Sequence, residues 1–160
     1  MSRLKIITEG NPILRNKSQE IAEITPKIKQ LILDMAETMQ KDEGIGLAAP
    51  QIGQNIRLIV VNTASGPLAL INPKITWKSL RKEIEEEGCL SCPDTFGPVK
   101  RAKVIYVKAL NKDNKNVSFR AQGLFARVIQ HEVDHLDGIL FFHRLSSFKK
   151  ILFKIKHPLL

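Results

Sequence analysis

The middle of this sequence, residues 57–121, most constrains the fold, because short apolar runs follow one another there with turns between them and no helical pattern. The first run, Arg57 to Val61, is separated by Ser65-Gly66-Pro67 from a second run, Leu68 to Ile71. Strands joined by short turns pair most readily as antiparallel hairpins. Because helical patterns lie only before and after this region, we predict an α+β fold with antiparallel sheets.

Further strands are expected in the same region. Asn72-Pro73 is expected to end the second run, so that a new strand covers Lys74 to Glu86. The alternation of apolar and polar residues within Val99 to Leu110 predicts one continuous strand. A polar turn at residues 111–116 then leads into a last strand, Val117 to Ala121.

Two helices are expected to flank the strands. Thr25 and Pro26 have the capping and first-turn chemistry of a helix start, and apolar residues then recur every three or four positions until Gly44 ends the helix. The simplest interpretation is a helix that packs on the core and has no further function. A second helix is expected to contain residues 127–138, which carry the chemistry of interest.

The predicted second helix contains His131-Glu132-Val133-Asp134-His135. On an α-helix, His131 and His135 lie on one face about one turn apart, so two imidazoles can reach one metal ion. Glu132 can lean toward the same ion without binding it, as a carboxylate does when it takes a proton from an activated water. A hydrolytic metal centre is therefore the leading hypothesis, and two surface histidines are the alternative.

Cys89 and Cys92 offer a further ligand for such a centre. One thiolate and two imidazoles would make a three-ligand set that leaves the fourth position open. Both cysteines together with both histidines would instead make a closed structural site without catalysis. We favour the open set, because nearly forty residues separate the two pairs and a closed site would leave Glu132 without a role.

The residues from Gly44 to Gly53 form a run of small side chains with one polar member, Gln51. A phosphate-binding loop is disfavoured, because the run follows a helix and leads into a strand, and it lacks the terminal Lys-Ser/Thr. The small residues can shape the wall of a cleft in which Gln51 offers an amide donor to a ligand. A plain tight turn with a solvated glutamine is the alternative.

The sequence contains three short motifs in this order: GIGLAAPQ at Gly44 to Gln51, EGCLS at Glu87 to Ser91, and QHEVDHLDG at Gln130 to Gly138. Together they resemble the three motifs of the bacterial-type peptide deformylases. The resemblance implies an α+β fold in which the last-motif helix lies among antiparallel sheets, with an N-terminal and a C-terminal helix. It also implies hydrolytic removal of the formyl group from the N-terminal formylmethionine of newly made proteins, with release of formate.

The resemblance also implies the roles of individual residues. Cys89, His131 and His135 would bind the metal, and Glu132 would be the catalytic acid and base. The metal implied is ferrous iron, although mixed Cys and His ligation also suits zinc, nickel or cobalt. Cys92 departs from the family pattern, which usually has an aliphatic residue there.

The remaining implied roles concern the substrate. Gln51 and the backbone amide of Leu90 would donate to the formyl oxygen as it becomes an oxyanion. Leu124 and Val128 share the helix face of His131 and could form an apolar floor for a methionine side chain, with Ile45 and Gly46 as a wall. The alternative for these apolar residues is ordinary core packing, because any buried helix has this pattern.

The C-terminal part of the sequence is basic. The chain has 25 Lys and Arg against 16 Asp and Glu, and no acidic residue follows Asp137. A helix is expected from about residue 145 until Pro158, capped by Ser146 or Ser147. Ribosomal RNA, an anionic membrane surface and packing on its own domain all suit such a helix, and the family resemblance favours docking on the ribosome. Its apolar stripe consists of Phe148, Ile151, Leu152 and Ile155.

Length and composition indicate one domain that spans residues 1–160, because the chain is 43% hydrophobic and has no long linker. Its apolar runs are too short to cross a bilayer, so no membrane insertion is expected. The N-terminal residues lack the apolar core of a secretory signal, and a cytoplasmic location is expected.

Two other classes of function remain open. One is a noncatalytic, metal-stabilised RNA-binding domain, which suits the net charge of +9. The chain has one Trp and one Tyr, and we find no interleaving of aromatic and basic residues, so support for base stacking is thin. The other is a metallopeptidase, although a cysteine ligand and the Gly44 to Gln51 block are not features of peptidases.

Overall fold

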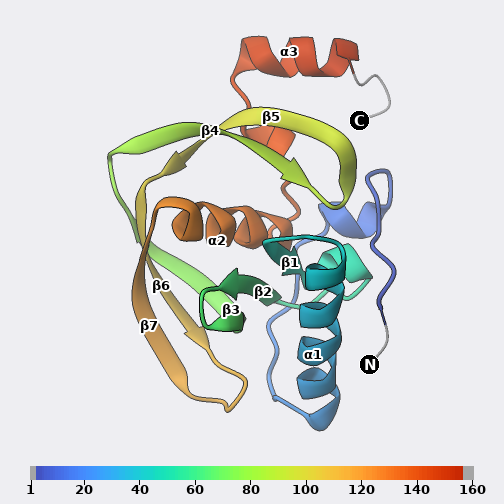
Figure 1. Cartoon of the computed structure of the whole chain (residues 1–160), viewed down its shortest axis with the longest axis vertical. Coiled ribbons are helices and arrows are strands. Elements are labelled where there is room, and N and C mark those ends of the chain that lie inside the picture. The colour runs from blue at the N-terminus through green and yellow to red at the C-terminus, as the bar shows by residue number, and fades with distance from the viewer. Residues whose placement is uncertain (1–2, 157–160) are drawn as a thin grey trace.

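The computed structural model describes residues 3–156 and contains two antiparallel sheets with helices between and around them (Figure 1). The strands in chain order are β1 (Gly46–Ala48), β2 (Leu58–Thr63), β3 (Gly66–Lys78), β4 (Lys82–Cys89), β5 (Cys92–Ala102), β6 (Val104–Leu110) and β7 (Asn116–Gln122). The α-helices are α1 (Pro26–Lys41), α2 (Gly123–Leu136) and α3 (Ser147–Lys156). Short 3-10 helices are η1 (Pro12–Arg15), η2 (Ala49–Ile52) and η3 (Phe141–Arg144).

The larger sheet has the order β1-β2-β3-β6-β7, and β4 and β5 form a separate hairpin. Every neighbouring pair is antiparallel. Helix α2 contacts strands of both sheets and lies between them, while α1 and α3 lie at the periphery (Figure 1). The predicted α+β fold, with antiparallel sheets around a central helix, is confirmed.

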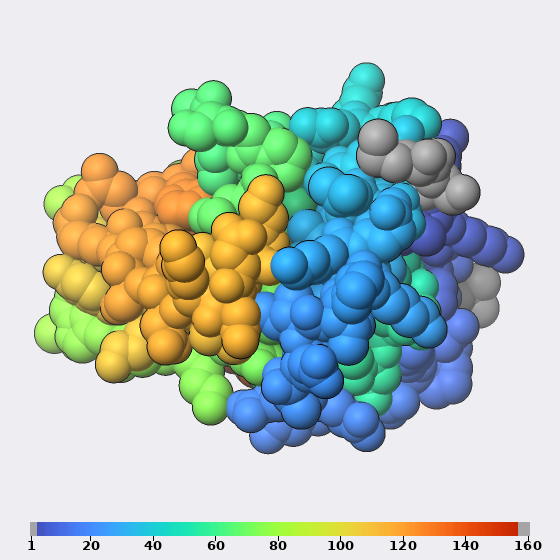
Figure 2. Space-filling view, turned by 90° about the horizontal axis from the view of Figure 1, so that it is seen from below, coloured from blue at the N-terminus to red at the C-terminus, as the bar shows by residue number. Residues whose placement is uncertain are grey.

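Helix α1 begins as predicted. The Thr25 side chain accepts a hydrogen bond from the Ile28 amide, and Pro26 occupies the first turn. Its buried face packs on β2 through Ile32, Met35 and Met39. Seen from below, α1 in blue lies beside the gold turn between β6 and β7 (Figure 2).

Helix α2 is buried on almost every side. Ala126, Ile129 and Val133 pack against the five-stranded sheet, which explains why the helix follows this sheet. Its polar side chains are buried as well, because they face the β4–β5 hairpin. A buried polar face needs partners of its own, and these partners form the site described below.

Two strand predictions were wrong in their boundaries. The segment from Val99 to Leu110 is divided between β5 and β6, because the chain leaves one sheet for the other at Lys103. The Lys103 amide donates to the Arg81 carbonyl at 3.0 Å, and its own carbonyl accepts from the Gly123 amide at 2.9 Å. These bonds stabilise the crossing point.

The predicted break at Asn72-Pro73 is a β-bulge inside β3. Asn72 has a positive φ of 50°, and its side chain bonds both the amide and the carbonyl of Ile21 at 2.9 Å. Because the bulge bends the strand without ending it, β3 continues to Lys78. The expected strand from Lys74 to Glu86 is therefore the end of β3 followed by most of β4.

Helix α3 makes limited contact with the rest of the molecule. Phe153 is buried against Phe141 and Phe142, and it is the buried residue of this helix. The predicted apolar stripe is exposed, from 45% at Leu152 to 70% at Phe148 and Ile155. Packing of that stripe on the chain's own domain is therefore wrong for residues 147–156. Pro158, where the helix was expected to end, lies outside the described residues. No helix within residues 3–156 is long and apolar enough to span a membrane.

Candidate functional site

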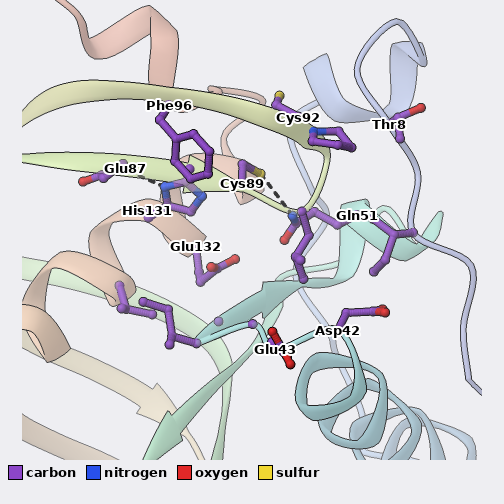
Figure 3. A pocket seen from close by; sticks show the side chains of 18 of the residues that line it. Thr8, Asp42, Glu43, Gln51, Glu87, Cys89, Cys92, Phe96, His131 and Glu132 are labelled. Carbon is purple, nitrogen blue, oxygen red and sulfur yellow. Dashed lines mark hydrogen bonds and ion pairs between the residues drawn. The ribbon is translucent and has the colours of Figure 1, made fainter.

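A cleft of about 1140 Å³ opens between α2, the β4–β5 hairpin and the loop that joins α1 to β1 (Figure 3). Strand β1 and η2, which carry the run of small residues, form one wall. The end of β4 forms the opposite wall, and α2 supplies the floor with its polar face. The three sequence blocks singled out above therefore meet in one place.

Cys89, His131 and His135 come together at the base of this cleft. The Cys89 Sγ atom lies 3.2 Å from His135 Nε2, which in turn lies 3.2 Å from His131 Nε2. All three ligand atoms lie within 4.8 Å of one another. One sulfur and two imidazole nitrogens that converge in this way fit a divalent transition-metal ion.

The electrostatics of the cluster also fit a cation. Although burial lowers it, hydrogen bonds to Cys89 and Glu87 raise the pKa of His131 to about 10. The pKa of the Cys89 thiol lies well below its usual range because of a hydrogen bond from Cys92 and the nearby His135. Binding of a divalent cation requires the thiolate and neutral imidazoles, so the ion would take the place of the proton that His131 holds.

The orientation of His131 is fixed by Glu87. His131 Nδ1 lies 3.0 Å from Glu87 Oε2, so the ring donates from Nδ1 and presents Nε2 to the cluster. Arg101 donates two hydrogen bonds to Glu87, at 3.0 and 2.9 Å, and Arg127 donates a third at 2.7 Å. The Glu87 carboxylate is only 7% exposed, and these cations keep it charged.

The same network continues through Asp134 on α2. Arg101 bridges Glu87 and Asp134, and Arg144 from η3 donates two further hydrogen bonds to Asp134. Burial raises the pKa of Glu87, but the bonds from His131 and Arg101 lower it more, to about 2. The pKa of Asp134 is lowered in the same way by Arg144 and Arg101 against the effect of burial.

Glu132 lies beside the cluster and is 4% exposed. Its Oε2 atom is buried and has no hydrogen-bond partner within the described residues. Burial raises the pKa of Glu132 to about 6, partly offset by His131 and His135. A buried carboxylate with an unused oxygen and a raised pKa is suited to accept and return a proton near neutral pH.

Gln51 and Leu90 face the cleft from its two walls. Gln51 is 2% exposed, and its Oε1 atom accepts from the Ala48 amide at 2.8 Å. Its Nε2 group donates to Ser91 Oγ at 3.2 Å and lies 3.4 Å from Cys89 Sγ, so the amide donor points at the hairpin turn (Figure 3). Leu90 occupies that turn between β4 and β5 and lines the cleft. The interpretation of Gln51 as a solvated turn residue is wrong.

Cys92 lies opposite Cys89 in the hairpin but is not part of the cluster of ligand atoms found within residues 3–156. It is 3% exposed and packs with Val99, Leu140 and Phe141. The hydrogen bond to Cys89, together with burial, raises the pKa of the Cys92 thiol. The geometry therefore favours three ligands over a closed four-ligand site.

A sequence model of the family described as Polypeptide deformylase matches residues 3–151 of the chain. The chain belongs to the polypeptide deformylase family.

Individual relatives agree with this membership. A peptide deformylase from Dictyoglomus thermophilum is 50% identical over 135 residues, which are 84% of this chain and 88% of the relative. The crystal structure of the Thermus thermophilus peptide deformylase has a TM-score of 0.92 and 39% identity, covering 96% of this chain and 92% of that one. The Synechococcus elongatus peptide deformylase, solved in complex with actinonin, has a TM-score of 0.90 and 37% identity over 97% of this chain and 86% of its own.

The four residues expected to bind substrate all line the cleft of this deformylase family member. Leu124 and Ile45 are 60% and 52% exposed, and exposed apolar side chains in a cleft are typical of a surface that contacts a ligand. Val128 lines the cleft but is only 6% exposed and packs in the core, so the core-packing alternative is correct for it. A Cβ atom on Gly46 would lie 2.4 Å from Glu132 Oε1, so only glycine leaves this oxygen accessible from the wall.

Several residues of the site were not predicted from the sequence. The pairing of Glu87 with Arg101 and Arg127 is not predicted by the sequence analysis, in which Glu87 appears only as the first residue of the second block. Two signals were present: Arg127 precedes His131 by one helical turn, and alternate residues of β4 share a face. Phe96 was also missed; it lines the cleft, is 62% exposed and lies against Gly88, where a Cβ atom would come within 2.5 Å of its ring.

Proposed function

We propose that this protein is a metal-dependent hydrolase that removes the N-formyl group from the N-terminal formylmethionine of newly synthesised proteins. Membership of the polypeptide deformylase family supports the removal of formyl groups from nascent peptides. The observation that carries the proposal for this chain is the unpartnered carboxylate of Glu132 beside a thiol and two imidazoles in an open cleft.

Cys89, His131 and His135 would hold the metal, and Glu87 would keep His131 in the tautomer that binding requires. We propose ferrous iron as the ion in the cell, with zinc, nickel and cobalt as ions that the same sulfur and nitrogen donors accept. When bound, a divalent ion supplies Lewis acidity that makes a water molecule a nucleophile near neutral pH.

Glu132 would carry out the proton transfers. Its free oxygen accepts a proton from the attacking water, and the new carbon–oxygen bond forms at the formyl carbon. Glu132 then gives the proton to the nitrogen, and the carbon–nitrogen bond breaks to release formate and a free amine. The raised pKa of Glu132 suits both steps, since one carboxyl group must accept and return the same proton.

Gln51 Nε2 and the amide of Leu90 would donate to the formyl oxygen as negative charge develops on it. Gln51 is suited to this role because its other amide atom is fixed by the Ala48 amide, which sets the direction of the donor. In other enzymes, removal of one such donor raises the activation free energy of the reaction by about 3 kcal/mol.

The methionine side chain would enter between the α2 floor and the β1 wall. Leu124 and Val128 would contact its methylene groups and sulfur, and Ile45 and Gly46 would border the peptide backbone. Main-chain hydrogen bonds along β1 would tolerate different residues after methionine, which suits an enzyme that acts on many nascent chains.

The proposed partners are nascent formylmethionyl polypeptides and, through α3, the ribosome. Helix α3 carries Lys149, Lys150, Lys154 and Lys156 and has no acidic residue, so it is attracted to polyanions. The proposed place of action is the cytoplasm, where these chains are made. Residues 1–160 would form one catalytic domain.

The test is an anaerobic assay of formate release from a formyl-Met peptide. The matched control is the same peptide with an acetyl group, which the proposed reaction must leave unchanged. Formate release that disappears after chelation and returns with added ferrous iron supports the proposal. Release of free amino acids from the peptide, without formate, would instead assign the site to peptide-bond hydrolysis.

A further inference from the structure

The outer face of β3, β6 and β7 carries the two largest aromatic side chains of the protein. Trp77 on β3 and Tyr106 on β6 are paired across the strands, with ring centroids 5.7 Å apart in an edge-to-face arrangement. They remain 51% and 45% exposed. Helix α2 covers the opposite face of this sheet, and the outer side of β6 and β7 is turned away from it (Figure 1).

Basic residues surround this aromatic pair in register. Arg120 on β7 lies opposite Tyr106, and Lys108 lies opposite Lys74 one row along. Because paired residues share a face of the sheet, these three cations lie on the same side as the rings. All three are exposed, and strands β3, β6 and β7 contain no acidic residue. Among residues 3–156, one of these cations forms an ion pair: Lys74 lies 3.0 Å from Glu20, and both side chains are more than half exposed.

The composition of this face differs from that of an interface with an apolar protein or a lipid core. One row carries both aromatic rings and Arg120, and the neighbouring row carries Lys74 and Lys108, so one extended ligand can place planar groups on the rings and phosphates on the cations. Duplex RNA hides its base faces, whereas single strands expose them to aromatic side chains. The charge complementarity therefore indicates a single-stranded nucleic acid. The choice of RNA rests on the proposed function, because a protein that acts on nascent chains works where RNA is abundant.

We propose that the outer face of β3, β6 and β7 binds single-stranded RNA. Trp77 and Tyr106 stack on bases, while Lys74, Lys108 and Arg120 contact phosphates. This inference goes beyond the proposed hydrolase, because no residue of β3, β6 or β7 lines the cleft. It also differs from the proposed docking of α3, which uses another part of the surface. Failure of RNA binding therefore leaves the hydrolase proposal untouched.

Trp77 provides a direct reporter, because it is the one tryptophan of the chain. Intact protein is titrated with a fluorescein-labelled single-stranded RNA of about ten nucleotides at low salt, and a matched unlabelled RNA is used for tryptophan emission. We expect saturable quenching of Trp77 over the same concentration range as the rise in anisotropy. Duplex RNA of the same length is expected to bind more weakly and to quench less.

Substitutions on the face locate the binding. Trp77→Leu and Tyr106→Thr are each expected to weaken single-strand binding about tenfold. The double variant Lys108→Ser/Arg120→Ser is expected to lower the slope of log affinity against log salt by about 0.7 for each lost phosphate contact. Its matched control is Lys27→Ser/Lys29→Ser, which removes the same charge from the exposed side of α1. Circular dichroism melting establishes that each variant is folded.

Three results would overturn the proposal. The first is a rise in anisotropy without quenching of Trp77, together with an equal loss of RNA affinity in the face variants and in the α1 control. RNA would then bind elsewhere on the protein. The second is duplex RNA that binds as tightly as the single strand. The third is that the protein binds anionic phospholipid vesicles, and that the same substitutions abolish vesicle binding but leave RNA binding intact. The face would then be a membrane-binding surface.

Discussion

Behind the cleft, between α2 and the β4–β5 hairpin, charged groups are buried and paired, whereas on the outer face of β3, β6 and β7 they are exposed. Arg101 and Arg127 are 5% and 6% exposed, and each holds Glu87, with Arg101 also holding Asp134. Lys108 and Arg120 stand free of carboxylate ion pairs on the outer face within the described residues.

The difference follows from what each region must do. A buried charge is tolerated only with partners, so the charges behind the cleft form a rigid frame for His131. An exposed charge costs little to keep and stays available for a partner molecule. The same residue types therefore hold the catalytic geometry on one side and offer a contact surface on the other.

The largest expected effect comes from the two cysteines of the hairpin. Cys89→Ser should abolish both metal binding and formate release, because it removes a ligand from the cluster. Cys92→Ser should retain both, since Cys92 packs with Val99, Leu140 and Phe141 outside the cluster. Metal content by elemental analysis, measured with activity on anaerobically purified protein, distinguishes them. Equal loss in the two variants would favour the closed structural site.

The next effect compares the two regions directly. Arg101→Met removes a cation that holds two buried carboxylates and should lower the free energy of unfolding by about 3 kcal/mol or more. Lys108→Met removes an exposed cation of the outer face and should change the free energy of unfolding by less than about 0.5 kcal/mol. Urea unfolding of both variants beside the unsubstituted protein gives the two values. Similar losses would contradict the division into a buried frame and a free face.

The last effect in this series is a dependence of stability on acid pH. The pKa of Glu87 is about 2 in the folded protein against an ordinary value of 4.5, so folding favours the charged carboxylate. Its contribution, on the order of 3 kcal/mol, is complete above about pH 4.5 and is lost as the pH falls toward 2. The lowered pKa of Asp134 acts in the same direction.

Unfolding measured at several pH values checks this dependence. The Glu87→Gln variant is the control, because it cannot titrate at this position and should lose less stability on acidification. A matched decline in both proteins would mean that other carboxylates cause the acid sensitivity.

Local chemistry made part of the fold predictable. Thr25 and Pro26 define the start of α1, and alternation placed the β6 residues on the correct faces. The crossing at Lys103 could not be seen, because alternation continues through it while the partner strand changes. The bulge at Asn72 was also hidden, since its side-chain bonds to Ile21 form only in the folded chain.

The site shows a similar division. The spacing of His131 and His135 predicted their shared helix face, and the second block suggested Cys89, so the three converge as expected. The partners of Glu87 depend on which strand faces α2, and this is a property of the tertiary fold. Trp77 and Tyr106 are 29 positions apart in the sequence and meet only through the register of β3 and β6. Interleaving of aromatic and basic residues is therefore present in space, although the sequence analysis did not find it.

The most direct test of the central claim is the rate of formate release by Glu132→Ala, measured anaerobically on a formyl-Met peptide with metal content determined for the same sample. Glu132 is not among the clustered ligands, so the variant should retain its metal. The account predicts that formate release falls by at least about a hundredfold, as expected when a general base is removed. A variant with full metal content and unchanged formate release would contradict it.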